Sequence, residues 1–289
     1  QDEIKANCLR HDSIGNIYCY GTFDGNIFFQ NTILSNSSDK DIFLIKTDTS
    51  GSLVWTKTVG GSDDVEASRF FIRDTNLFII GTFSGTANFQ NTSISSFGDD
   101  DGFLASISLE NNESWVSSIN SSDDVSPSDI YVDNENNIYI IGSIESDTYF
   151  DNIFTQNSSD EDLFICKYDI FGNAQWVKSV GGTNDIEGKT IYSNTKKELI
   201  FSGNFEGSAF FDSITISALD EKDGFFGKLT LDSFNISNMP IKEEKLMVFP
   251  NPTDNLIKLE IENYNGSFDA ELYDFTGKLL ETTNKTAIR

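Results

Sequence analysis

The chain is poor in positive charge and has no long apolar run. Its 289 residues include 20 lysines and arginines against 46 aspartates and glutamates, which gives a formal net charge of −26. Nucleic acids and anionic lipids need a basic footprint on their partner, so we expect neither as a ligand. No run approaches the roughly 18 apolar residues of a membrane helix, which predicts a soluble or surface-attached protein.

Histidine and cysteine are nearly missing, which removes the usual components of several kinds of active site. His11 is the single histidine, so no Ser-His-Asp or Cys-His set can be assembled, and zinc-type ligand spacing is absent. Cys8, Cys19 and Cys166 are odd in number and unclustered. We expect free, buried thiols, with a Cys8–Cys19 bridge as the alternative. The sequence predicts a protein that is not an enzyme.

What the sequence does have is a block of about sixty residues that occurs four times. A strand-like phrase recurs in each block: G-N-I-Y-C-Y-G-T-F at 15–23, N-L-F-I-I-G-T-F at 76–83, N-I-Y-I-I-G-S-I at 137–144 and E-L-I-F-S-G-N-F at 198–205. One glycine of each phrase anchors the repeat, with spacings of 60, 61 and 61 residues: Gly21, Gly81, Gly142 and Gly203. Self-similarity at a fixed period indicates stacked supersecondary units.

Each block contains four short apolar stretches separated by Asn, Asp, Gly and Ser, which is typical of strands and turns. In the second block we expect strands at 68–74, 76–83, 101–108 and 113–119. No helical period interrupts them, so the chain is predicted to be all-β. The stretch 138–141 has no polar position and should therefore be covered on both faces. Four strands and one sheet per block match the blades of a β-propeller.

Other residue types recur at fixed places in the blocks. A Phe stands between the second and third stretches, the third stretch opens with Asp and has Phe two positions later, and the fourth carries Trp. These residues are Phe29, Phe89, Phe150 and Phe211; Asp41, Asp101, Asp162 and Asp223; Phe43, Phe103, Phe164 and Phe225; and Trp55, Trp115 and Trp176. We interpret the repeated rings as packing between adjacent blades.

The phrases at 15–23, D-I-F-L-x-K at 41–46 and G-x-x-x-W-x-K-x-x-G-G at 51–61 resemble a bacterial β-propeller repeat family found in many secreted proteins. The resemblance covers about residues 4–234 and implies a propeller with structural repeats. We place the propeller at 1–234, with repeats at about 1–60, 61–120, 121–181 and 182–234. Ser237 stands where the fourth Trp is expected, so the last strand is expected to be degenerate or missing. Since six to eight blades are commoner than four, we expect further blades before Gln1.

The composition changes after the repeats. Residues 235–245 are interpreted as a linker, and the run F-P-N-P-T at 249–253 follows it. An alternating apolar stretch and then Y-D-x-x-G-K at 273–278 come next. Two prolines favour an extended entry, and F-T-G-K at 275–278 predicts a hairpin turn.

The coupled P-N-P-T and Y-D-x-x-G-K motifs resemble the C-terminal sorting domain of type IX secretion cargo, a small immunoglobulin-like β-sandwich. We assign 246–289 to such a domain, with only its first strands present. The resemblance implies a secreted or cell-surface protein whose partners are the outer-membrane translocon and its cargo-shuttling or attachment proteins. The implied recognition residues are Pro250, Asn251, Pro252, Thr253 and Gly277.

Acidic residues recur after each fourth stretch, in S-D-D-V at 62–65, S-D-D-V at 122–125 and T-N-D-I at 183–186. On equivalent loops, Asp64, Asp124 and Asp185 could form a ring of carboxylates that binds Ca²⁺ or a cationic ligand. The simpler interpretation is hydrogen bonding in turns. No other cofactor is predicted.

The sequence therefore predicts a non-enzymatic binding or structural module with a C-terminal secretion signal. Its ligand, an extracellular glycan or protein, stays open. A calcium- or glycan-binding surface adhesin is one alternative. A propeller glycosidase is another, although the acids are too numerous to nominate a catalytic pair.

Overall fold

The computed structural model describes residues 3–109, 114–158, 160–193 and 198–231, and further along it describes the backbone of the strands at 246–250, 267–273 and 279–286. These described residues contain strands and turns but no helix, so none of them forms a helix that could cross a membrane. All pairings between the strands are antiparallel, which confirms the all-β prediction. The chain divides into two compact units, Gln1–Pro252 and Thr253–Arg289.

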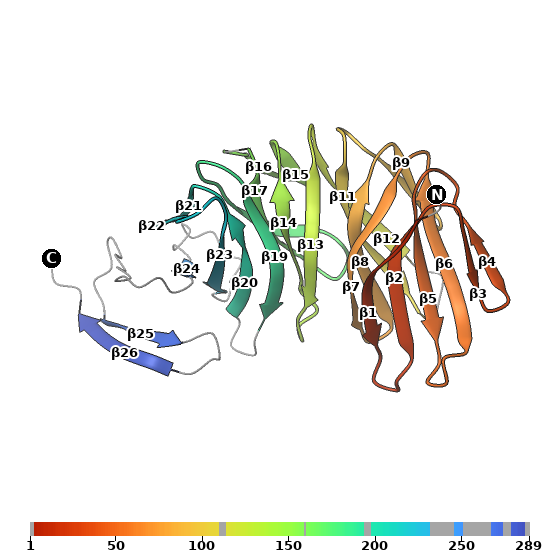
Figure 1. Ribbon diagram of the computed structural model, residues 1–289, viewed down its shortest axis with the longest axis horizontal. Coiled ribbons are helices and arrows are strands. Elements are labelled where there is room, and N and C mark those ends of the chain that lie inside the picture. The colour runs from red at the N-terminus through yellow and green to blue at the C-terminus, as the bar shows by residue number, and fades with distance from the viewer. Residues whose placement is uncertain are drawn as a thin grey trace. The chain divides into compact units, whose positions relative to one another are not determined.

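The unit Gln1–Pro252 repeats one order of four strands four times, and each set of four is called a sheet here (Figure 1). Hairpin strands extend the first and second of these sheets to six strands. The first sheet has β1 (Ile4–His11), β2 (Ile17–Phe23), β5 (Asp41–Thr47) and β6 (Leu53–Gly61), and the second has β7 (Val65–Arg73), β8 (Asn76–Phe83), β11 (Asp101–Ser108) and β12 (Ser114–Ser121). The third has β13 (Val125–Val132), β14 (Ile138–Ile144), β17 (Asp162–Tyr168) and β18 (Ala174–Val180), and the fourth has β19 (Ile186–Ser193), β20 (Glu198–Phe205), β23 (Asp223–Thr230) and β24 (Leu246–Pro250). The predicted strands 76–83 and 101–108 coincide with β8 and β11.

Each sheet also carries a short hairpin between its second and third strands, which the sequence pattern does not predict as strands. The hairpins are β3 (Asn26–Phe29) with β4 (Thr32–Ser35), β9 (Thr86–Phe89) with β10 (Thr92–Ser95), β15 (Thr148–Phe150) with β16 (Ile153–Thr155), and β21 (Ser208–Phe211) with β22 (Ile214–Ser217). Strand β9 pairs with β6 of the preceding sheet, β15 pairs with β12, and Ala209 forms a bridge to Gly182. These hairpins join neighbouring sheets at their edges.

The last strand of the fourth sheet comes from a segment that the sequence pattern assigns to the C-terminal domain. Strand β24 pairs with β23, with Phe249 opposite Phe226 and Leu246 opposite Leu229. The expected W-x-K-x-x-G-G strand is absent from the sequence here, and the apolar run at 246–250 forms the fourth strand instead. The fourth sheet is therefore complete in strand number.

In the unit Thr253–Arg289, β25 (Ser267–Tyr273) pairs with β26 (Leu279–Thr286). The two strands pair on either side of residues 274–278, and the predicted turn at 275–278 lies outside the described residues. Among the predicted recognition residues, Pro250 ends β24. The others, Asn251, Pro252, Thr253 and Gly277, lie outside the described residues.

The four sheets pack face to face and bury the apolar side chains of their central strands. All seven residues of β14 are buried, including the stretch 138–141, whose lack of polar positions predicts burial on both faces. Between the first and second sheets, Tyr20 and Leu44 lie in one apolar cluster with Ile79 and Phe103. Equivalent clusters lie between the second and third sheets and between the third and fourth. The repeated apolar positions of the sequence are therefore contacts between sheets.

The anchor glycine of each repeat lies where three strands come closest. In the second sheet, Gly81 pairs with Phe103 of β11 and with Ala67 of β7, which has a bulge at this point. A Cβ at Gly81 would lie 2.0 Å from the carbonyl oxygen of Glu66 and 2.8 Å from the Phe103 ring. The same contacts restrict Gly21, Gly142 and Gly203. A phenylalanine ring over a glycine thus fixes the register in every sheet.

The recurring rings contact one another within each repeat, whereas the sequence pattern predicts contacts between adjacent blades. The hairpin phenylalanines contact those of the third strands, with ring centroids 5.0 Å apart for Phe89–Phe103, 4.8 Å for Phe150–Phe164 and 5.1 Å for Phe211–Phe225. The tryptophans contact second-strand rings at 6.0 Å for Trp55–Tyr18, 6.3 Å for Trp115–Phe78 and 6.3 Å for Trp176–Tyr139. These aromatic residues are structural.

Candidate functional site: the acidic loops

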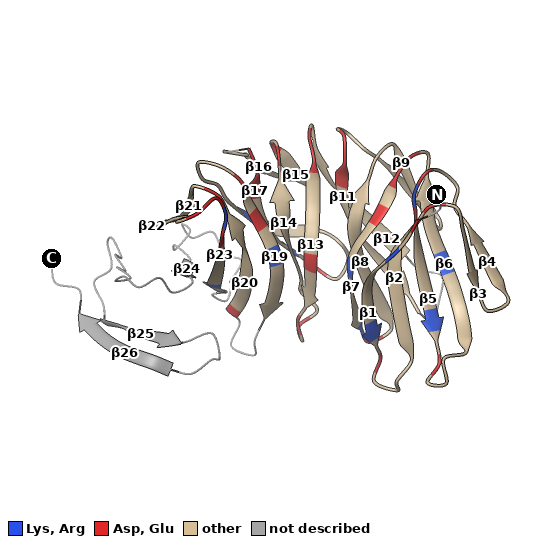
Figure 2. Ribbon diagram, viewed as in Figure 1, with Lys and Arg blue, Asp and Glu red and all other residues tan. Residues whose placement is uncertain are grey.

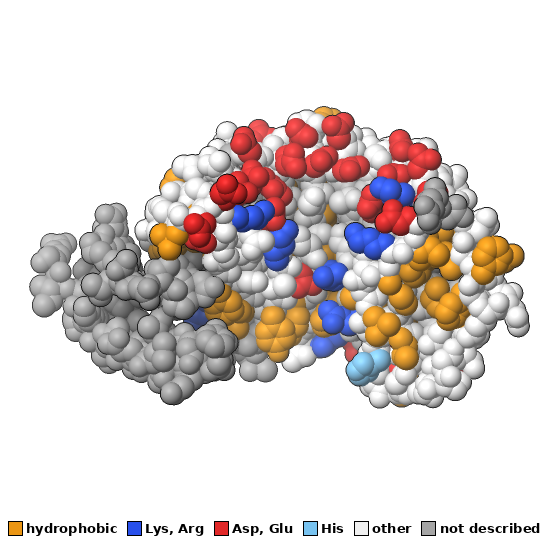
Figure 3. Space-filling view, in the orientation of Figure 1, with side chains coloured by type: hydrophobic (Ala, Val, Ile, Leu, Met, Phe, Trp, Pro, Cys, Tyr) orange, Lys and Arg blue, Asp and Glu red, His pale blue; other side chains and the backbone are white. Residues whose placement is uncertain are grey.

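Acidic side chains gather at one end of the four sheets, where the loops lie (Figures 2 and 3). The same backbone hydrogen bonds join the loops at each boundary between sheets. Amide-to-carbonyl distances are 2.9 Å for Val65 to Lys40, 2.8 Å for Val125 to Asp100 and 2.8 Å for Ile186 to Glu161. Three further backbone amides donate to the backbone carbonyl oxygens of the predicted aspartates. The distances are 2.9 Å for Ser84 to Asp64, 3.0 Å for Glu145 to Asp124 and 2.9 Å for Glu206 to Asp185. The predicted aspartates therefore occupy equivalent backbone positions.

The carboxylates of Asp64 and Asp124 belong to two separate groups. Each group has carboxylate oxygens within 4.8 Å of one another: Asp39, Asp63 and Asp64 at the first boundary, and Asp99, Asp123 and Asp124 at the second. At the third boundary, Asn184 precedes Asp185 in the place of an aspartate. The structure thus shows local triads, and a single ring of Asp64, Asp124 and Asp185 stays a prediction. Each triad has the oxygen ligands that a hard cation prefers.

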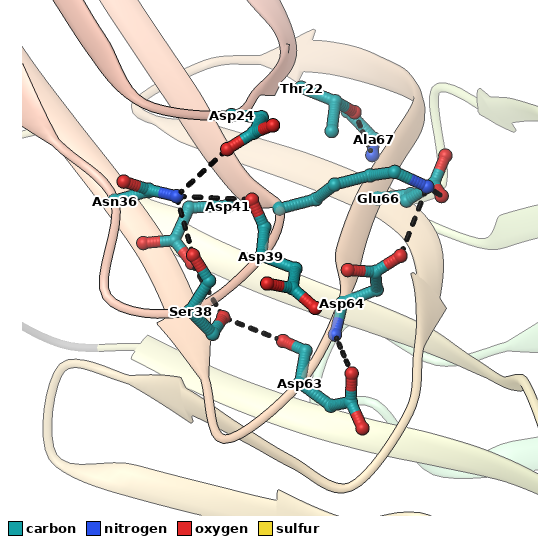
Figure 4. Close-up of polar contacts among 11 residues, drawn as sticks. Thr22, Asp24, Asn36, Ser38, Asp39, Asp41, Asp63, Asp64, Glu66 and Ala67 are labelled. Carbon is teal, nitrogen blue, oxygen red and sulfur yellow. Dashed lines mark hydrogen bonds and ion pairs between the residues drawn. The ribbon is translucent and has the colours of Figure 1, made fainter. Parts of the chain in front are cut away.

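At the first boundary a lysine neutralises the loops. The Lys40 ammonium lies 3.0 Å from the Asp64 carboxylate and forms a second ion pair with Glu66 (Figure 4). Hydrogen bonds to Glu66 and Asp64 raise the pKa of Lys40 against the effect of partial burial. The Ser38 hydroxyl donates to the Asp63 carbonyl at 2.8 Å and ties the two loops together. At this boundary the Lys40 ammonium therefore provides the positive charge that balances the carboxylates.

The second boundary has the same backbone but no lysine. Asp100 stands at the position of Lys40, and its amide donates to the Asp124 carboxylate at 3.2 Å. Partial burial and the charge of Asp124 raise the pKa of Asp100. Partial burial and the charges of Asp124 and Glu161 likewise raise the pKa of Glu145. Raised carboxyl pKa values mark a place where an added cation would be stabilising.

At the third boundary, Lys189 and Lys222 lie beside the acidic residue Glu187. Burial and the charges of Glu187 and Asp185 raise the pKa of Glu161 against a hydrogen bond from Ser143. Burial also acts to raise the pKa of Glu187, but hydrogen bonds from Lys189 and Lys222 outweigh it and lower the pKa. The Lys222 ammonium lies 2.8 Å from the Glu187 carboxylate. The least neutralised carboxylates therefore lie around Asp100 and Asp124.

One recurring acid, the aspartate that opens each third strand, fastens the loops instead of facing solvent. Asp41, Asp101 and Asp162 are buried. The Asp101 carboxylate accepts hydrogen bonds from the amides of Phe97 at 2.6 Å and Ser121 at 2.9 Å. A Cβ at Gly60 would lie 2.2 Å from the Asp41 carboxylate, which explains the glycine at the end of the fourth strand. These aspartates are structural.

The three cysteines are free, as predicted. Cys166 is buried, and burial raises the pKa of its thiol. Cys8 and Cys19 are half-buried on opposite faces of the first sheet, where Cys8 packs toward the second sheet and Cys19 packs away from it. The structure thus contains no Cys8–Cys19 bridge.

Two small cavities lie at equivalent places between sheets. One of about 150 Å³ is lined by residues that include Lys57, Val59, Phe89 and Ile107, and one of about 100 Å³ by residues that include Lys178, Val180, Asp212 and Leu229. Between the second and third sheets, the larger Tyr168 stands at the position of Ile107 and Leu229. Ligand pockets usually enclose roughly 300–1,000 Å³, so we interpret these cavities as packing gaps.

The sequence pattern identifies Asp64, Asp124 and Asp185 but misses the residues that set the charge around them. Lys40, Asp100, Glu161 and Lys222 stand 60, 61 and 61 residues apart, which is the period of the anchor glycines. The spacing alone could have identified these positions, but the residue type and its charge change between repeats.

Comparison with known proteins adds no relative. No model of a known protein family matches the sequence, and no curated protein matches it.

Proposed function

We propose that the four sheets are consecutive blades of a β-propeller, and that it serves as a non-enzymatic binding or structural module of a secreted or cell-surface protein. The observation that carries this proposal is the repetition of one contact: the same strand positions bury apolar side chains at three successive boundaries. Face-to-face packing of four-stranded antiparallel sheets is how propeller blades associate. The hairpins that pair with the preceding sheet are consistent with this arrangement.

We propose further that the C-terminal residues are a type IX sorting domain, read by the outer-membrane translocon and its cargo-shuttling or attachment proteins. The motifs P-N-P-T at 250–253 and Y-D-x-x-G-K at 273–278 support this assignment. The separate compact unit Thr253–Arg289 and its β25–β26 hairpin also support it. Because Pro250 ends a strand of the fourth sheet, the sorting motif starts at the boundary between the two units.

Export can be tested in a host with a type IX system. We expect the protein with its own C-terminus to reach the cell surface or the medium, and a Pro252→Ala/Gly277→Val variant to stay in the periplasm. Asp64→Asn is the matched control, since it lies in the repeats and should be exported normally. Protease accessibility on intact cells and fractionation provide the readout. Periplasmic retention of the parent, or normal export of the double variant, would refute the sorting assignment.

The two carboxylate triads support a second candidate function, binding of Ca²⁺ at the loop end. Isothermal titration with CaCl₂ should give heat with the parent and much less with Asp64→Asn/Asp124→Asn/Asp185→Asn. Asp74→Asn is a control at an exposed acid outside the triads. A parent that gives no heat rules calcium out.

A further inference from the structure

The first sheet exposes apolar residues whose counterparts in the other three sheets are buried. Counterparts are identified by strand register: Ile4 pairs with Phe23 as Val65 pairs with Phe83, and Leu9 pairs with Cys19 as Phe70 pairs with Ile79. Ile4 is 55% exposed against 0% for Val65, Val125 and Ile186; Leu9 is 64% exposed against 0%, 2% and 4% for Phe70, Ile130 and Ile191; and Ile17 is 37% exposed against 0% for Leu77, Ile138 and Leu199. In the later sheets, these positions are covered by the preceding sheet.

Figure 3 shows hydrophobic side chains gathered over the end of the molecule formed by β1 to β6. We call this surface, which includes Ile4, Leu9 and Ile17, the outer face of the first sheet. Large exposed apolar surfaces on a soluble protein mark interaction sites. The outer face therefore needs a covering partner.

The hairpin of the first sheet also lacks the contact that the other hairpins make. Among the described residues, Asn26–Phe29 of β3 pairs with β4 alone, and Phe28 is 75% exposed. The counterpart β9 pairs through Asn88 and Ala87 with the Gly60–Gly61 end of β6. An unpaired strand edge is a template for another strand. The free edge of β3 adjoins the exposed outer face, so one partner could satisfy both.

We infer that the outer face binds a further four-stranded sheet of this same repeat, outside the 289 residues, whose last strand pairs with β3. The three existing boundaries define the chemistry of that partner. It presents large apolar side chains at the positions of Tyr20, Ile42 and Leu44, which are fully buried where the first sheet meets the second. Its last strand ends in Gly-Gly, because a Cβ at Gly61 would lie 1.7 Å from the carbonyl oxygen of Thr86 in the next hairpin.

The face of the fourth sheet that points away from the third sheet does not match this description, so the partner is not a second copy joined head to tail. Ser202 stands where Tyr20, Ile80 and Ile141 are buried in the first three sheets. On the same face, Phe226 is 48% exposed and Lys228 forms an ion pair with Glu198 at 3.1 Å. A terminal repeat with a more polar outer face is typical of the end of a repeat array. The exposed face of the fourth sheet is therefore more polar than the outer face of the first.

This inference rests on the proposed blade arrangement but not on export, so it can be tested with purified protein. A second copy of residues 4–64 is joined directly to Ile4, so that Ile4 follows Asp64 as Val65 does in the parent. We expect the original β3 amides, Asn26–Phe29, to exchange with deuterium about tenfold more slowly than in the parent, because a neighbouring strand now protects them.

The matched control carries Tyr20→Ser in the added copy, which reproduces the residue found at Ser202. It should give less protection of β3 than the unmodified copy. An added copy that folds without protecting β3, or one that stays unfolded against the first sheet, overturns the inference. So does protection of β3 in the parent that increases with protein concentration, since that result assigns the face to a second copy. None of these outcomes affects the export assay.

Discussion

The faces between the sheets and the acidic loops at their end follow the same period, but they tolerate change very differently. Between the sheets one residue type returns in every repeat, as at Phe43, Phe103, Phe164 and Phe225. In the loops the backbone hydrogen bonds return while the side chain changes sign, as at Lys40, Asp100, Glu161 and Lys222. Close-packed interiors respond to a single methylene, whereas solvent-exposed charges contribute little. The faces therefore define the repeat, and the loops are where repeats can differ.

The largest effect is expected from emptying a face. Phe103 is fully buried and packs on Phe89 and Phe83, so Phe103→Ala should lower the free energy of unfolding by about 3–5 kcal/mol. Phe97→Ala is the control, because Phe97 is 77% exposed and its loss should change stability by less than about 0.5 kcal/mol. Urea denaturation followed by circular dichroism measures both. Equal effects of the two variants would show that the faces do not dominate stability.

Filling the space beside an anchor glycine should have a smaller but clear effect. Gly81→Ala places a methyl group against the Glu66 carbonyl and the Phe103 ring, and overpacking of this kind costs about 1–3 kcal/mol. Gly224→Ala, in the third strand of the fourth sheet, is the control, because its nearest atoms lie 3.8 and 3.9 Å from the added Cβ. Thermal unfolding of the two variants tests the difference. If Gly81→Ala melts with the parent, close approach does not explain the anchor glycine.

These contrasts also explain how much of the molecule the sequence could predict. The anchor glycines and repeated phenylalanines revealed the sheets because packing admits one residue type at each place. The hairpins could not be predicted because their strands have only three or four residues, too few to show alternation beside turn residues. Strand β24 could not be foreseen either, because it joins the fourth sheet only through pairing with β23.

The loops were predictable in position but not in charge balance. The spacing of Asp64 and Asp124 was visible along the chain. Lys40 lies on a different loop, and only the packing of the sheets brings its ammonium within 3.0 Å of Asp64. A charge that arrives from another loop leaves no local pattern in the sequence.

Changing a charged residue in one of two loops should alter the free energy of unfolding less than Phe103→Ala or Gly81→Ala does. Lys40→Met removes the ion pairs to Asp64 and Glu66, and we expect a loss of about 0.5–1 kcal/mol because all three side chains are partly exposed. The reciprocal variant Asp100→Lys brings a cation beside Asp124 and should stabilise by about 0.5 kcal/mol. Both effects should shrink in 1 M NaCl, as measured by the melting temperature. A Lys40→Met variant that is more stable than the parent, or an Asp100→Lys variant that is less stable, would contradict this interpretation of the loops. So would effects that 1 M NaCl leaves unchanged.

The smallest effect is the pH dependence of the loop carboxyl groups whose pKa is raised. The raised pKa values of Asp100, Glu145 and Glu161 mean that these groups bind protons more tightly in the folded protein than in the unfolded chain. Their protonation therefore stabilises the fold at low pH, and this stability is lost as the pH rises above their ordinary values of 3.8 and 4.5 through the raised ones.

Asp100→Asn/Glu161→Gln removes two of these groups and should raise stability at pH 7 by about a few tenths of a kcal/mol, because solvent screens the exposed charges. Below their ordinary pKa values, the parent and the variant should converge. Glu187→Gln is the contrasting control: ion pairs lower the pKa of Glu187, so its contribution is present at neutral pH and lost as the pH falls. Urea denaturation at several pH values distinguishes the two slopes. A double variant less stable than the parent at pH 7 would show that these carboxylates make favourable contacts in the folded protein. Their negative charge would then not destabilise the fold.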